Sequence, residues 1–355
     1  MKKFYAFLKG ISMNSHNIPT SSRNTWMDCI KIISTFLIML NHSISHVWTS
    51  HPIDTFTWKT IHMFFLMSRI AVPLFFICSG AGMLRKEHSI SQIFKKNIFG
   101  LLKIYVAWML VYGSVSCISL FREHLATPRT CINAFIKSII FGQYHTWFVF
   151  TLLSLYLITP FLFQITRTRE NMKYYLILSL IFTIVFPWLR SFDFLSRLTE
   201  TLDNFNMNFV CGYTLYYVAG YYICTLSWKK IYSQIAAVIF FISFVITYVS
   251  SLKISVTSNI PYQESFMELS PLMVVISLSV FCMFKGLDER WDSRIIKRLI
   301  GYGFALYLMH PLFLSYVQKL SGLHALYGTL VLYFSCVCIC FLISKSKLLS
   351  KLLLK

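Results

Sequence analysis

The strongest constraint on this chain is a succession of apolar stretches, each long enough to cross a lipid bilayer. A membrane-spanning helix needs about 17–25 mostly apolar residues, and about ten stretches approach that length. The sequence therefore predicts an all-α, polytopic membrane bundle of about ten transmembrane helices. The expected spans are 26–49, 60–84, 99–121, 147–165, 173–190, 209–226, 233–251, 269–285, 300–318 and 325–344.

The composition excludes a soluble protein. Hydrophobic residues make up 56% of the chain and charged residues only 13%, whereas a soluble surface needs about a quarter charged residues. We expect a cytoplasmic N-terminal segment at 1–25, a single transmembrane domain at 26–345 and a cytoplasmic tail at 346–355. The first 25 residues lack the apolar core of a cleavable signal, so the first apolar stretch is expected to act as an uncleaved anchor.

The positive charge of the chain, +20 at neutral pH, is distributed unevenly. When successive connections are assigned to alternate sides of the membrane, most lysines and arginines fall on the side that holds both termini. The positive-inside rule then predicts that both termini are cytoplasmic. We expect the protein to lie in the plasma membrane. The basic excess favours contact with anionic membrane lipid, and no nucleic-acid partner is expected.

The ten cysteines are scattered and predict neither a metal site nor a bound cofactor. Cys336, Cys338 and Cys340 alternate along one expected helix, so Cys338 should point away from the other two. Cys117 and Cys131 fall near an outward connection and could pair, a question that the spacing leaves open.

A histidine inside the first apolar stretch is the leading candidate for chemistry. Lys31 precedes His42 by eleven residues, and Asp28 precedes Lys31 by three. Because an α-helix turns by about 100° per residue, these side chains share one face. Ionisable groups at membrane depth are costly and tend to mark a pathway or reaction site. A histidine bonded to a backbone carbonyl is the alternative, and the spacing favours the functional interpretation.

The second apolar stretch contributes another cation, Arg69, which lies too far inside for easy snorkelling and is also expected to be functional. Pro73 should kink the helix by freeing the carbonyl four residues earlier. For Gly80, which follows Ser79, close helix packing is the favoured interpretation.

A basic run precedes the third stretch. Lys95 and Lys96 serve equally well as a topology signal or as a landing site for an anionic ligand. Lys103 lies within the apolar run, and a ligand-binding role is favoured there.

Two further histidines stand beside segment boundaries. His145 precedes Trp147, a residue type that often anchors a helix end at the membrane interface. His310 precedes Pro311 inside the ninth stretch, and taken alone it is most simply explained as bonding a carbonyl freed by the proline.

Taken together and in order, these segments resemble the bacterial integral-membrane acyltransferase-3 superfamily, whose members typically O-acetylate surface polysaccharides. One departure is that many members carry arginine where this chain has Lys31; lysine keeps the charge but lacks the planar fork. The resemblance rests on Asp28 and Lys31-x10-His42 (first-helix motif), Leu74–Gly80 (FFxxSG helix), Lys95, Lys96 and Lys103 (basic cluster), His145-x-Trp147-Phe148 with Tyr156 and Pro160 (WF segment), and Tyr307–Pro311 (YLxHP segment).

The resemblance implies transfer of an acetyl group from cytoplasmic acetyl-CoA to a hydroxyl of an outward-facing glycan or lipid-linked sugar. His42 would act as general base or as a nucleophile forming an acyl-imidazole. Arg69 would stabilise an oxyanion or pair with phosphate, and Lys31 would hold the pantetheine-phosphate end or polarise the thioester. The expected substrate-binding residues are Asp28, Ser79, Lys95, Lys96, Lys103, His145, Trp147 and His310.

Two other classes remain open at this point: a polysaccharide exporter of related fold and a non-catalytic sensory membrane domain. A transporter should contain paired broken helices and a continuous polar pathway. An acyltransferase should instead contain an inward groove for CoA that ends at His42.

Overall fold

The computed structural model describes residues 24–190, 192, 201, 204–287 and 294–354; the N-terminal segment expected at 1–25 lies outside them apart from Asn24 and Thr25. No strand occurs in these ranges. The α-helices are α2 (Thr25–Ser50), α3 (Phe56–Ser68), α4 (Ala71–Met83), α5 (Ile90–Gln92), α6 (Phe99–Arg122), α7 (Pro128–Phe141), α8 (Trp147–Ile165), α9 (Arg169–Leu180), α10 (Phe186–Leu189), α12 (Thr214–Thr225), α13 (Lys230–Ser258), α14 (Pro271–Lys285), α15 (Arg294–Met309), α16 (Pro311–Val317), α17 (His324–Lys345) and α18 (Lys347–Leu353), and the π-helical segments are η1 (Ile93–Ile98) and η2 (Ile181–Val185).

The all-α, polytopic fold is confirmed. Among the described residues, eight helices are long and apolar enough to cross a membrane, or nine if α15 and α16 form one bent span. The expected span at 209–226 is wrong, because its helix α12 has only 12 residues. At 1.5 Å per residue such a helix covers roughly 18 Å, well short of a bilayer core of about 30 Å.

The apolar character of α12 serves packing inside the protein instead. A Cβ atom added to Gly80 of α4 would lie 1.9 Å from the Tyr217 carbonyl oxygen, and one added to Gly220 of α12 would lie 2.1 Å from the Ile77 carbonyl oxygen. The two helix backbones therefore touch at a pair of glycines, as small residues allow in membrane bundles. The packing interpretation of Gly80 is confirmed.

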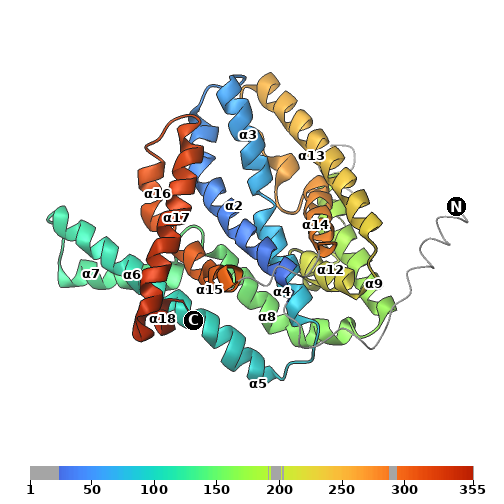
Figure 1. Ribbon diagram of the computed structural model, residues 1–355, viewed down its shortest axis with the longest axis horizontal. Coiled ribbons are helices and arrows are strands. Elements are labelled where there is room, and N and C mark those ends of the chain that lie inside the picture. The colour runs from blue at the N-terminus through green and yellow to red at the C-terminus, as the bar shows by residue number, and fades with distance from the viewer. Residues whose placement is uncertain (1–23, 191, 193–200, 202–203, 288–293, 355) are drawn as a thin grey trace, which may run out of the picture.

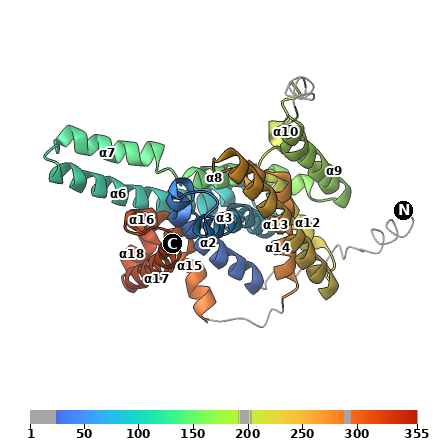
Figure 2. The same cartoon turned by 90° about the horizontal axis from the view of Figure 1, so that it is seen from above.

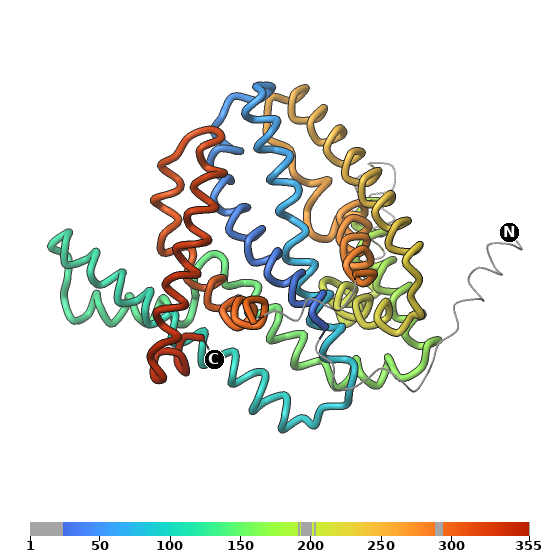
Figure 3. The backbone as a smooth tube through the Cα atoms, in the orientation of Figure 1, coloured from blue at the N-terminus to red at the C-terminus, as the bar shows by residue number. Residues whose placement is uncertain are grey.

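Helix α2 runs through the middle of the bundle and contacts α3, α4, α15 and α17 (Figure 1). The path from α3 to α4 continues in one general direction (Figure 3), with a short interruption at Arg69 and Ile70. Pro73 explains this interruption, since it lacks the N–H that would bond the Arg69 carbonyl. The α6–α7 hairpin projects away from the rest of the bundle in both cartoon views (Figures 1 and 2).

The cysteines behave as small side chains in these helices. Cys336 and Cys340 are buried while Cys338 is exposed, which confirms the predicted alternation. Cys117 and Cys131 are both free thiols, and the Cys117 Sγ lies 3.6 Å from the Cys131 carbonyl oxygen. Within the described ranges no group of three or more histidine, cysteine or acidic side chains is arranged to hold a metal ion.

Candidate active site

A small cavity with several polar side chains in its wall lies beside His42, in the second half of α2. Its volume is about 70 Å³, enough for a few reacting atoms or waters. We call it the histidine chamber. It is lined by Ile38, Asn41, His42, Ser68, Arg69, Ala71, Val72, His145, Trp147, Phe148, Glu268 and Tyr307.

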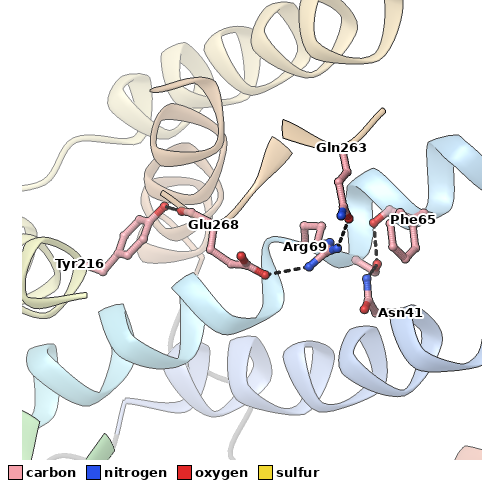
Figure 4. Close-up of polar contacts among 7 residues, drawn as sticks. Asn41, Phe65, Arg69, Tyr216, Gln263 and Glu268 are labelled. Carbon is pink, nitrogen blue, oxygen red and sulfur yellow. Dashed lines mark hydrogen bonds and ion pairs between the residues drawn. The ribbon is translucent and has the colours of Figure 1, made fainter. Parts of the chain in front are cut away.

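The Arg69 side chain is held rigidly in the wall of this chamber (Figure 4). Its Nη1 donates to Glu268 Oε1 at 3.0 Å and its Nη2 donates to Gln263 Oε1 at 2.6 Å. Both members of the ion pair are largely buried, with side-chain exposures of 18% for Arg69 and 12% for Glu268. A buried charge needs such a partner, so the pair fixes the guanidinium in one position.

The backbone of Glu268 and the side chains of Asn41 and Ser68 are themselves held by hydrogen bonds. The hydroxyl of Tyr216 donates to the backbone carbonyl of Glu268 (Figure 4). On the opposite wall, Asn41 Nδ2 donates to Ser68 Oγ at 2.8 Å, and Ser68 in turn donates to the Phe65 carbonyl oxygen at 2.6 Å. The chamber is therefore preorganised by hydrogen bonds between α2, α3 and the segment that precedes α14.

Three imidazoles meet at His42. The His42 ring lies 5.3 Å from the His310 ring, and His310 lies 5.6 Å from His145, measured between centroids. Tyr144 packs edge-on against His42 at 5.2 Å. His145 and His310 are essentially inaccessible, at 1% and 0% exposure. Two distant parts of the chain, one at Tyr144 and His145 and one at His310, thus come together beside the predicted catalytic histidine.

His310 lies at the break between α15 and α16, and its hydrogen bond there defines the tautomer of its ring. The two helices meet at an angle of 70°, and His310 Nδ1 lies 2.8 Å from the Tyr307 carbonyl oxygen. Because a carbonyl oxygen only accepts, Nδ1 must carry the proton, which leaves Nε2 of the neutral ring as an acceptor. Nε2 has no partner among the described residues. The carbonyl-bonding role expected for His310 is therefore present, together with a free acceptor atom.

A second and larger cavity adjoins the first. Its volume is about 290 Å³, and Lys31 lies in its wall, so we call it the lysine chamber. Phe148 and Tyr307 line both chambers and form the partition between them. The wall as a whole is mostly apolar. It is formed by Lys31, Thr35, Phe75, Ser79, Leu101, Phe148, Leu152, Tyr156, Ile300, Gly303, Phe304 and Tyr307.

The predicted site residues divide between these places. His42, Arg69, His145 and Trp147 line the histidine chamber, whereas Lys31 and Ser79 line the lysine chamber. His310 contacts His42 from behind the wall.

Besides His310, four predicted binding residues lie outside both cavities. Asp28 is buried on α2 but lines neither chamber. Lys95, Lys96 and Lys103 are exposed and line neither chamber. They follow the surface of η1 and α6, whereas Leu101 of the same helix reaches the lysine chamber.

Sequence reasoning missed the acidic partner of Arg69. Glu268 stands at the start of an apolar stretch, and the chain contains only 13 acidic residues. An acid at such a boundary could have suggested a counter-charge for Arg69, but nothing local links two positions that lie so far apart in sequence. Gln263 and Asn41 carry no sequence signal of this kind.

Comparison with protein families identifies the class. The family model described as an acyltransferase domain, Acyl_transf_3, matches residues 24–345. The chain therefore belongs to the acyltransferase-3 family and is a multi-pass membrane acyltransferase. Comparison with curated proteins and with solved structures returns no match.

Proposed function

We propose that this membrane acyltransferase transfers an acetyl group from acetyl-CoA to a hydroxyl of an extracytoplasmic glycan or lipid-linked sugar. The observation that carries the proposal is the pair of chambers along α2, with Lys31 in one, His42 in the other, and Phe148 and Tyr307 between them. A donor arm entering through the lysine chamber would bring its thioester to the histidine chamber.

The dimensions and polarity suit such a donor. Lys31 and His42 are separated by roughly 16 Å along the helix axis, comparable to a pantetheine arm. The arm is a flexible chain with few charges, which agrees with the mostly apolar wall of the lysine chamber. The phosphates of CoA would stay outside, where Lys95, Lys96 and Lys103 are exposed. This assignment places the termini and these lysines in the cytoplasm, and the protein in the plasma membrane.

In the reaction, the acceptor hydroxyl loses its proton to the His42 imidazole while its oxygen attacks the thioester carbonyl. The C–S bond then breaks, and the CoA thiolate takes the proton from the imidazolium. Arg69, fixed by Glu268 and Gln263, stabilises the negative charge that develops on the carbonyl oxygen. In the second route, the His42 imidazole attacks the thioester carbonyl, the C–S bond breaks, and CoA leaves as the thiol with the imidazole N–H proton. The acceptor hydroxyl then takes the acetyl group from the acetyl-imidazole and returns its own proton to the ring.

The test uses the purified full chain in lipid nanodiscs with radiolabelled acetyl-CoA, measuring binding, hydrolysis and transfer to membrane glycans. Loss of His42 in His42→Ala should lower turnover by about 10²–10⁴-fold without abolishing donor binding. The matched control is His46→Ala, one turn further along α2, whose ring bonds the Leu320 carbonyl and lines neither chamber. The proposal fails if the wild-type protein binds no acetyl-CoA, which would favour transport, or if His42→Ala turns over normally.

The two routes are separated by a single turnover without acceptor. Acid quenching followed by peptide mass spectrometry should find an acetyl group on His42 if the imidazole is the nucleophile. Absence of this adduct, with transfer intact, assigns His42 the role of general base.

A further inference from the structure

A groove on the outer surface of α15 and α17 is unrelated to the two chambers. Its volume is about 480 Å³, and it is walled by apolar side chains with two arginines at one end. The two helices are packed together, and Tyr302 joins them by donating to Ser344 Oγ at 3.2 Å. The groove is lined by Arg294, Ile295, Arg298, Leu299, Tyr302, Val337, Cys338 and Phe341.

The cations of this groove gather at the end where α15 begins and α17 stops. The Arg298 guanidinium lies 5.8 Å from the centre of the Phe341 ring, and Lys345 Nζ lies 4.6 Å from the same ring. Arg294, one turn before Arg298, adds a third positive charge. None of the three forms an ion pair with a described acidic residue. Three cations therefore stand beside an apolar groove, and the described part of the chain places no acidic ion-pair partner against any of them.

Helix α15 separates this groove from the donor path. Arg294, Arg298 and Tyr302 recur every four residues and share one face of the helix, whereas Ile300, Gly303 and Tyr307 face the lysine chamber. At about 100° per residue, Arg298 and Ile300 point to nearly opposite sides. A ligand in the groove would therefore contact lipid and not the reacting groups.

From this arrangement we propose that the α15–α17 groove is a binding site for an anionic phospholipid. One acyl chain lies along Leu299, Val337 and Phe341, and the phosphate is bound by Arg294 and Arg298 with support from Lys345. Basic pockets between transmembrane helices bind anionic head groups in this way, and a groove of mostly apolar wall requires the chain as well as the head group. This site goes beyond the proposed acetyl transfer and does not depend on it.

The test is a native mass spectrometry titration of the purified protein with phosphatidylglycerol and phosphatidylcholine of the same acyl chains. The wild-type protein should bind phosphatidylglycerol more tightly than phosphatidylcholine. The double variant Arg294→Gln/Arg298→Gln should bind it roughly thirtyfold more weakly, about fivefold for each cation near the lipid surface. The control Lys173→Gln/Lys229→Gln removes the same charge from exposed positions outside the groove and should leave the affinity unchanged.

A second variant tests the apolar part separately. Cys338 is exposed and lines the groove, so Cys338→Trp should fill it and abolish the preference while all three cations remain. If the double arginine variant does not fold, Cys338→Trp still tests whether phosphatidylglycerol binds in the groove. Equal weakening in the control pair would overturn the proposal, because the attraction would then be diffuse. Displacement of the lipid by glycerol 3-phosphate or by CoA would also overturn it, because the site would then recognise phosphate without a lipid chain.

Discussion

The histidine chamber has a volume of about 70 Å³ and the lysine chamber about 290 Å³, although Phe148 and Tyr307 line both. The smaller one brings together imidazole, guanidinium, carboxylate and amide groups, several of them fixed by hydrogen bonds. The larger one has a mostly apolar wall, in which Lys31 is the one cation and no acid occurs among the described residues.

This difference indicates how one membrane bundle can bind the acyl donor in one cavity and catalyse the transfer in another. Rigid polar groups in a small cavity stabilise charge as it develops, because they need little reorganisation. A roomy apolar space accommodates a long flexible arm but does little to its reactive end. Substitutions in the two chambers should therefore change different kinetic constants, and this expectation can be tested directly.

The largest expected difference is between Arg69→Ala and Lys31→Ala. Arg69→Ala should lower kcat by about 10²–10³-fold, because the developing oxyanion loses its fixed donor. Lys31→Ala should instead raise the KM for acetyl-CoA by roughly tenfold, the effect of losing about one charged contact, with kcat nearly unchanged. Steady-state kinetics with labelled acetyl-CoA distinguish the two patterns.

Stability must be measured alongside, since Arg69→Ala leaves the largely buried Glu268 unpaired. Breaking a buried ion pair costs about 3–5 kcal/mol of folding stability. A thermal melt in nanodiscs, together with the charge-conserving Arg69→Lys, separates this loss from a loss of catalysis. If both alanine variants changed only KM, the division of labour between the chambers would be refuted.

An intermediate effect is expected from filling the lysine chamber. A Cβ at Gly303 would meet only Thr35 Oγ1, at 3.6 Å, so Gly303→Leu should fold and extend into the cavity. Overpacking costs about 1–3 kcal/mol, which corresponds to roughly 5- to 150-fold weaker donor binding. Isothermal titration with acetyl-CoA measures this change.

The same helix provides a matched control. Gly301 has no neighbour within 4 Å of an added Cβ and lines neither chamber, so Gly301→Leu should leave donor binding intact. Equal loss in both variants would indicate a general disturbance of α15 and not a blocked cavity.

The smallest effect should come from the shared wall. The Tyr307 hydroxyl donates to the His145 carbonyl oxygen, and Tyr307→Phe removes this bond while keeping the ring between the chambers. A typical hydrogen bond contributes about 0.5–1.5 kcal/mol, so kcat should fall by roughly 2- to 10-fold, as initial rates would measure. A loss of several hundredfold would instead assign the hydroxyl a direct part in the reaction.

How far the sequence predicted the fold can be seen in individual segments. Long apolar runs such as Lys230–Ser258 could be recognised as spans because length and composition alone decide bilayer crossing. The run at 209–226 could not be distinguished from a span, since an apolar helix buried against α4 has the same composition. Its true length, 12 residues in α12, depends on where its neighbours allow it to end.

For the candidate site, helical periodicity correctly linked Lys31 and His42 on α2, because both lie on one rigid element. It could not link His42 to Tyr144, His145 and His310, whose positions depend on how α8, α15 and α16 pack around α2. The same holds for the exposed lysines at 95, 96 and 103: the sequence located them before and within the third apolar stretch but could not locate them relative to the cavities.

The sequence by itself determined that this chain is a helical membrane protein with a lysine and a histidine about three turns apart on one helix. These properties follow from local physics: apolar length and helical repeat. Only the tertiary structure decided that Glu268 neutralises Arg69, that His310 lies between His42 and His145, and that Phe148 and Tyr307 line both chambers. Contacts between distant segments depend on the packing of the whole bundle, and no local pattern encodes them.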